Sequence, residues 1–207
     1  MYTPTKTGDT VKILQLLSLG YSPIQKFAEA ENGTPLHVAA SEGHVLTSHI
    51  LVQAGAELDA IDDEKNTPLM LACDKGRPSI VKYLLASGAD LTLRGDDGMT
   101  CLHLAAQNGH LDCVHIILTQ NALPRKFINL QDEGGWTSLV WACENKHEDV
   151  IQWVEKHFLS AQDLRAVSLQ VSGLHNAKLQ WFWKKLRNRN IWINQTLIIR
   201  VIFKWDY

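Results

Sequence analysis

The sequence predicts an all-α solenoid, in which units of one β-turn and a helix-turn-helix stack side by side. A four-residue phrase that starts with threonine recurs every 33 residues, at Thr34, Thr67 and Thr100, and a fourth copy starts at Thr137. Two small residues follow soon after each phrase, and in three of the copies a glycine comes next. Because one such unit cannot bury its apolar side alone, we expect the stacking of the units to form the core.

Each part of the repeated unit has a structural reason. The phrases, which begin the first helices, are Thr34-Pro35-Leu36-His37, Thr67-Pro68-Leu69-Met70, Thr100-Cys101-Leu102-His103 and Thr137-Ser138-Leu139-Val140. The small pairs, which let successive first helices approach closely, are Ala39-Ala40, Ala72-Cys73, Ala105-Ala106 and Ala142-Cys143. Gly43, Gly76 and Gly109 stand where first helices should end, because glycine adopts the left-handed conformation without a Cβ clash.

The second helix of each unit reads as an apolar stripe at helical spacing, as in residues 80–85 and 114–118. Residues 8–20 have the pattern of a second helix from an incomplete leading unit. The period and these slots are those of ankyrin repeats. The predicted domains are a partial leading repeat at residues 1–31, four ankyrin repeats at residues 32–158, and an atypical basic and aromatic tail at residues 159–207.

The chain has 207 residues and a net charge of −2, but the charge is unevenly divided. Residues 1–159 carry 12 basic and 20 acidic side chains, or −8, whereas residues 160–207 carry 8 and 2, or +6. No signal sequence begins the chain and no run reaches the roughly 18 apolar residues of a membrane span, so we expect no membrane partner. Cys73 and Cys143 occupy alanine slots and Cys101 a proline slot, which is typical of reduced core cysteines in an intracellular protein.

The histidines do not indicate a metal or a catalytic site. His37 and His103 share one repeat slot, where we expect them to link neighbouring turns by hydrogen bonds. No His, Cys, Asp and Glu residues have the spacing of a zinc site, and the chain lacks a phosphate-binding glycine loop and a nucleophile elbow. We therefore predict no metal, no cofactor and no enzymatic activity.

The fourth repeat carries the functional signal. Trp136 stands just before Thr137 at the predicted turn tip, and Trp141 lies on the following first helix. Glu144 follows three residues later, so it shares one helical face with Trp141. We expect this face to line the concave groove of the stack. Two indoles and a carboxylate suit a methylated ammonium, because cation–π attraction is strong for a weakly hydrated cation. A carboxylate favours mono- or dimethyllysine, which keep an N–H to donate. The alternative is that both tryptophans fill gaps between repeats.

A resemblance to a known family supports the first interpretation. Residues 134–144, which read Gly-Gly-Trp-Thr-Ser-Leu-Val-Trp-Ala-Cys-Glu, resemble the ankyrin domain of the euchromatic histone-lysine methyltransferases, as do residues 51–56, 67–70 and 100–106. The resemblance covers roughly residues 32–157. It implies a nuclear, chromatin-associated module that binds mono- and dimethylated lysine on the histone H3 tail through Trp136, Trp141 and Glu144.

The chain departs from that family in two places. The family takes a further cage tryptophan from the next repeat, whereas a 33-residue step from Trp141 reaches Leu174. Residues 160–207 offer no counterpart of the family's catalytic SET domain, so we expect a fragment without it. The competing hypothesis is a generic ankyrin scaffold that binds a folded protein in its groove.

The tail has three interpretations. The basic and aromatic residues 181–189 could form a surface for nucleic acid or anionic lipid, or the tail could cap the last repeat. We favour the third, an alternative or truncated C-terminus of a longer family member, and expect no direct binding of nucleic acid. Residues 197–203 are β-prone and carry an aggregation risk.

Overall fold

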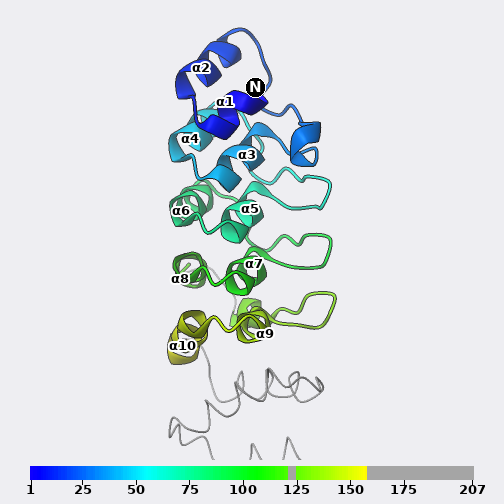
Figure 1. The fold of residues 1–207 in the computed structure, drawn as a ribbon, viewed down its shortest axis with the longest axis vertical. Helices are drawn as coiled ribbons and strands as arrows, with labels where there is room; N and C mark the ends of the chain where they lie inside the picture. The colour runs from blue at the N-terminus through cyan, green and yellow to red at the C-terminus, as the bar shows by residue number, and fades with distance from the viewer. Residues whose placement is uncertain (121–124, 158–207) are drawn as a thin grey trace, which may run out of the picture.

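The computed structural model describes residues 1–120 and 125–157, which form five stacked helix pairs (Figure 1). First helices form one column of the stack and second helices the other. The pairs are α1 (Tyr2–Thr7) with α2 (Thr10–Ser18), α3 (Pro35–Glu42) with α4 (Val45–Gln53), α5 (Pro68–Asp74) with α6 (Pro78–Ala86), α7 (Cys101–Gln107) with α8 (Leu111–Leu118), and α9 (Ser138–Glu144) with α10 (Glu148–His157). Short 3-10 helices lie at η1 (Ala28–Ala30) and η2 (Arg125–Asn129). The predicted all-α solenoid is confirmed.

The leading unit is more complete than the sequence indicated. Its second helix, α2, was predicted, but the short α1 precedes it and packs against α3. Thr5 holds in α1 the slot that Ala40 holds in α3, and it is fully buried. Its hydroxyl donates to the carbonyl of Met1 at 2.9 Å, so this buried polar group is satisfied.

The threonine of each phrase caps a first helix. Thr67 Oγ1 accepts from the backbone N–H of Met70 at 3.3 Å, and Thr137 Oγ1 accepts from that of Val140 at 3.4 Å. Thr34 and Thr100 form capping boxes with the histidine three residues on. Each cap satisfies donors that the first helical turn would leave unpaired, which fixes where the helix begins.

The core follows the line of first helices. The four alanines that open the small pairs expose no surface, and these are Ala39, Ala72, Ala105 and Ala142. Cys73, Cys101 and Cys143 are buried free thiols, as predicted, and so is Cys113. No helix among the described residues is long and apolar enough to cross a bilayer. The predicted tail, residues 159–207, lies outside the described residues, as does Leu174.

Hydrogen bonds join each hairpin to the next. The backbone N–H groups of Asp63, Asp96 and Glu133 each donate to a carbonyl in the preceding hairpin, at 2.9, 3.1 and 3.0 Å. His37 and His103 add a second set of bonds. His37 Nε2 donates to the Asn66 carbonyl at 3.0 Å. The linking role predicted for this histidine slot is confirmed.

His103 makes the same kind of link to the fourth hairpin. Its Nε2 donates to the carbonyls of Leu130 and Trp136 at 3.1 and 3.2 Å, and its Nδ1 accepts from the backbone N–H of Thr100. Burial lowers the pKa of His103 and of His37, because the charged ring would lose its hydration. Both rings are therefore held neutral inside the stack.

A buried threonine generates the first prediction. Thr47 is 1% exposed and its hydroxyl has no hydrogen-bond partner, whereas the same slot holds Ile80, Cys113 and Val150 in the later repeats. Thr47→Val keeps the shape and removes the unpaired hydroxyl, so we expect it to raise the free energy of unfolding by about 1 kcal/mol. Urea denaturation would measure this change. The control is Ser48→Ala, since the buried Ser48 hydroxyl donates to the His44 carbonyl and its removal should not stabilise. A destabilised Thr47→Val variant would contradict the assignment.

The neutral histidines generate a second prediction. In the folded state the pKa values of His37 and His103 are lowered, whereas in the unfolded chain they are ordinary. Below about pH 6.5 the unfolded chain therefore binds more protons than the folded protein. The free energy of unfolding should therefore decrease as the pH falls through that value. Each group can contribute at most about 1.4 kcal/mol per pH unit. Replacing both by methionine, the residue that Met70 places in this slot, should reduce the slope between about pH 5 and pH 7. An unchanged slope in urea denaturation would show that these rings do not govern it.

Candidate functional site

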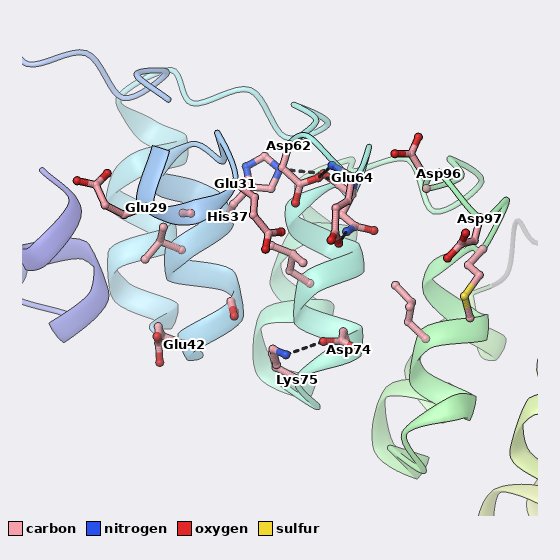
Figure 2. Close-up of a pocket in the computed structure, with 18 of the residues that line it drawn as sticks. Glu29, Glu31, His37, Glu42, Asp62, Glu64, Asp74, Lys75, Asp96 and Asp97 are labelled. Carbon is pink, nitrogen blue, oxygen red and sulfur yellow. Dashed lines mark hydrogen bonds and ion pairs between the residues drawn. The ribbon is translucent and has the colours of Figure 1, made fainter. Parts of the chain in front are cut away.

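A groove of about 630 Å³ runs along the inner side of the first three full repeats (Figure 2). Its apolar floor is formed by Val38, Leu71 and Leu104, which hold on α3, α5 and α7 the slot that Trp141 holds on α9. Met99 lines the groove in the slot of Trp136. Ser41 and Asp74 line it in the slot of Glu144. All three predicted site residues therefore occupy slots that face the groove in preceding repeats.

The groove is strongly acidic. Eight carboxylates line it, namely Glu29, Glu31, Glu42, Asp62, Glu64, Asp74, Asp96 and Asp97 (Figure 2). Among these lining residues Lys75 is the one lysine or arginine. Repulsion from Glu31, followed by burial and the charge of Asp62, raises the pKa of Glu64. The groove thus has a negative potential that a cationic partner would relieve.

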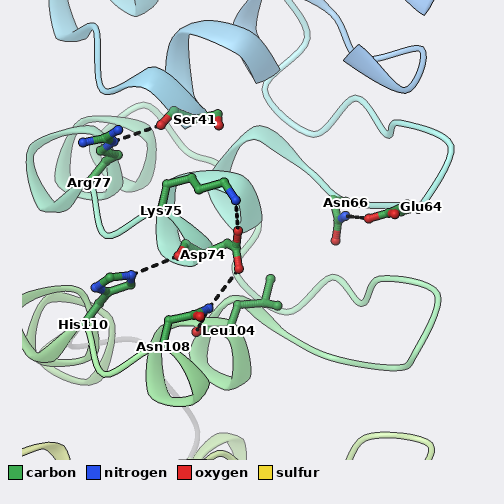
Figure 3. A network of polar contacts seen from close by, with 9 residues as sticks. All are labelled: Ser41, Glu64, Asn66, Asp74, Lys75, Arg77, Leu104, Asn108 and His110. Carbon is green, nitrogen blue, oxygen red and sulfur yellow. Dashed lines mark hydrogen bonds and ion pairs between the residues drawn. The ribbon is translucent and has the colours of Figure 1, made fainter. Parts of the chain in front are cut away.

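Hydrogen bonds between repeats fix the lower edge of the groove (Figure 3). The Asp74 carboxylate accepts from Asn108 Nδ2 and pairs with Lys75 Nζ, both at 2.9 Å. His110 Nε2 donates to the Asp74 carbonyl at 2.9 Å, and Arg77 Nε donates to the Ser41 carbonyl at the same distance one repeat earlier. These bonds satisfy carbonyls at helix ends and hold each repeat in register with the next.

The two predicted tryptophans lie together. The turn of the fourth hairpin comprises residues 133–135, so Trp136 lies just after the turn and not at its tip, where the sequence had predicted it. Trp141 is in the middle of α9. Their ring centroids are 4.8 Å apart and their planes are tilted by 50°. Both side chains are half-buried, and Trp136 also packs against the core. The pair therefore presents two adjoining ring surfaces that meet at an angle.

A buried carboxylate that sequence reasoning missed joins the two tryptophans. Asp132 Oδ1 accepts from the backbone N–H of Trp136 at 2.8 Å, and Asp132 Oδ2 accepts from Trp141 Nε1 at 2.7 Å. Asp132 itself is 9% exposed. The sequence does contain a signal for this residue, because Asp62 stands in the same repeat slot, at the same distance before Thr67 as Asp132 before Thr137. Asp62 likewise accepts hydrogen bonds from the backbone of its own hairpin.

Glu144 is the last residue of α9, one helical turn beyond Trp141, and it is half-buried. The candidate site thus combines two indoles with the Glu144 carboxylate, and Asp132 is hydrogen-bonded to both tryptophans. No group of three or more His, Cys, Asp and Glu side chains in the described parts of the chain is placed to hold a metal ion. The chemistry on offer is binding of a cation that has an apolar surface.

Known proteins resemble this chain over part of its length. It is 40% identical over 65 residues to the histone-lysine N-methyltransferase EHMT1 of Mus musculus and 40% identical over 64 residues to that of Homo sapiens. Each match covers 31% of this chain and 5% of the relative. The chain therefore corresponds to a small part of these relatives.

A protein-family model matches most of the chain. The family model described as "Ankyrin repeats (3 copies)" matches residues 5–95 and 89–163, which together make up most of the chain. Ankyrin repeats mediate protein–protein interaction and are not catalytic. The chain belongs to the ankyrin repeat family.

Proposed function

We propose that this chain binds mono- or dimethylated lysine of the histone H3 tail, with Trp136, Trp141 and Glu144 as the contacting residues. The observation that carries the proposal is the tilted indole pair at groove-facing slots, with a carboxylate one turn away on α9. The similarity to EHMT1, which is named as a histone-lysine N-methyltransferase, supports the choice of partner and a nuclear location.

The binding would rest on two physical terms. Methylammonium groups are weakly hydrated, so their transfer to the ring faces costs little and gains cation–π attraction. The Glu144 carboxylate would accept a hydrogen bond from the N–H that mono- and dimethyllysine retain. The negative potential of the acidic groove would also attract a cationic peptide over a long range.

The third prediction tests the indole on α9. Trp141→Ala should weaken binding of a dimethylated H3 peptide by about 1–2 kcal/mol, because one cation–π surface is lost. The measurement is a titration with unmodified, mono-, di- and trimethylated peptides. A matched control is Trp153→Ala, since Trp153 lies between His115 and His157 and comes from α10, in the column of second helices. Equal affinity of wild-type protein for methylated and unmodified peptides would overturn the proposed function.

The fourth prediction concerns the choice between methylation states. Glu144→Gln keeps the size of the side chain and removes its charge, so the preference for mono- and dimethyllysine over trimethyllysine should become smaller. Asp74→Asn is the matched control, because Asp74 occupies the same slot two repeats earlier. If Asp74→Asn reduces the preference between methylation states as much as Glu144→Gln does, the preference comes from the general negative potential of the groove and not from a hydrogen bond to Glu144.

A second candidate function is a protein-interaction scaffold that binds a basic partner. The eight carboxylates along the groove favour it, because their mutual repulsion would be relieved by lysine or arginine side chains. This function predicts binding that depends on salt and on peptide charge. Trp141→Ala would then leave affinity unchanged, which separates the two hypotheses.

A further inference from the structure

The buried carboxylate of Asp132 is hydrogen-bonded to both tryptophans of the candidate site. It lies in the turn of the fourth hairpin, where its own backbone N–H donates to the Trp136 carbonyl at 2.9 Å. Its two carboxylate oxygens bond to different groups. Oδ1 accepts from the backbone of Trp136, and Oδ2 accepts from the indole of Trp141, nine residues further along the chain.

The second repeat provides an internal comparison. Asp62 occupies the same slot and is 6% exposed, and its Oδ1 accepts from the backbone N–H groups of Glu64 and Asn66 at 3.0 and 2.8 Å. The slot of Trp141 holds Leu71 in that repeat, so no indole faces this carboxylate. The hairpin bonds are therefore general to the slot, and the bond to the indole is particular to the fourth repeat.

The indole bond constrains Trp141. A half-buried tryptophan on a helix can rotate about its side-chain bonds, and a short N–H to carboxylate bond selects one orientation. The same carboxylate holds the backbone of Trp136. The 4.8 Å separation and 50° tilt of the rings thus have one common anchor.

We propose that Asp132 is the positioning residue of this site: it fixes the two indoles in the relative orientation that receives a methylated lysine. This inference rests on the proposed function and adds a residue that acts through the two tryptophan rings. Both carboxylate oxygens are engaged by the tryptophans, so Asp132 sets ring geometry without a direct bond to the ligand.

The test uses Asp132→Asn in the full chain. The two tryptophans bond to different oxygens of Asp132, and asparagine replaces one of these acceptors by an NH2 donor, so one of the two bonds must be lost. Affinity for a dimethylated H3 peptide should therefore fall about tenfold or more, as expected for a bond to a charged group. Asp62→Asn is the matched comparison, because it removes the same charge from the same hairpin slot and from the groove. The loss of affinity in Asp132→Asn should exceed the loss in Asp62→Asn by at least about fivefold.

A double-mutant cycle separates positioning from a general effect on the hairpin. Trp141→Phe keeps an aromatic wall but has no N–H, so Asp132→Asn should have little further effect on affinity in that background. An equal loss of affinity in both backgrounds would overturn the inference, as would wild-type affinity in Asp132→Asn.

A ligand-free measurement keeps the inference independent of the proposed function. In a ¹⁵N-resolved NMR spectrum of the wild-type protein, the Trp141 indole N–H, identified by its loss in Trp141→Phe, should exchange with solvent at least about tenfold more slowly than a free indole. The same resonance should shift and lose protection in Asp132→Asn but not in Asp62→Asn. Exchange at the free rate would refute the anchor, even if Asp132→Asn fails to fold. Failure of the wild-type protein to prefer methylated peptides would instead refute the proposed function and leave this measurement to decide the role of Asp132.

Discussion

The structure depends on the close approach of first helices from successive repeats. The helices meet at alanines that expose no surface, such as Ala39, Ala72 and Ala105. A larger side chain there would separate the repeats, and the backbone bonds between hairpins would lengthen and weaken. The spacing of the groove residues and of the hairpin tips is therefore inherited from the core.

The same constraint explains how a binding site can be placed on one repeat without disturbing the rest. The slot of Trp141 faces the groove, and its counterparts Leu71 and Leu104 are only half-buried. Burial in the fourth repeat is supplied by the neighbours Leu139 and Val140, which are almost fully enclosed. An indole can replace a leucine at this slot because no core cavity has to accommodate its extra volume.

The sequence predicted the helix pairs, the buried histidines and the neighbouring tryptophans because each depends on the repeat period or on positions within one repeat. It missed α1, which has no Thr-Pro-Leu-His phrase and is held by packing on α3. It also missed Asp132, because the partner of each carboxylate oxygen is decided by the fold of the hairpin onto α9, nine residues away. The overall acidity of the repeats was visible, but its concentration in one groove required the stacking of three repeats.

The fourth hairpin is also tied to the repeat before it, which connects site geometry to stack stability. The Trp136 carbonyl accepts from His103 Nε2, while His103 Nδ1 accepts from the backbone N–H of Thr100. Only the neutral ring with its proton on Nε2 satisfies both bonds, since a charged ring would place a second N–H against that of Thr100. The burial that lowers the pKa of His103 therefore preserves this tautomer. The backbone beneath one indole is held from the third repeat by a neutral histidine and from its own turn by Asp132. A small shift of the third repeat would consequently reach Trp136 through the bond from His103 Nε2 to its carbonyl.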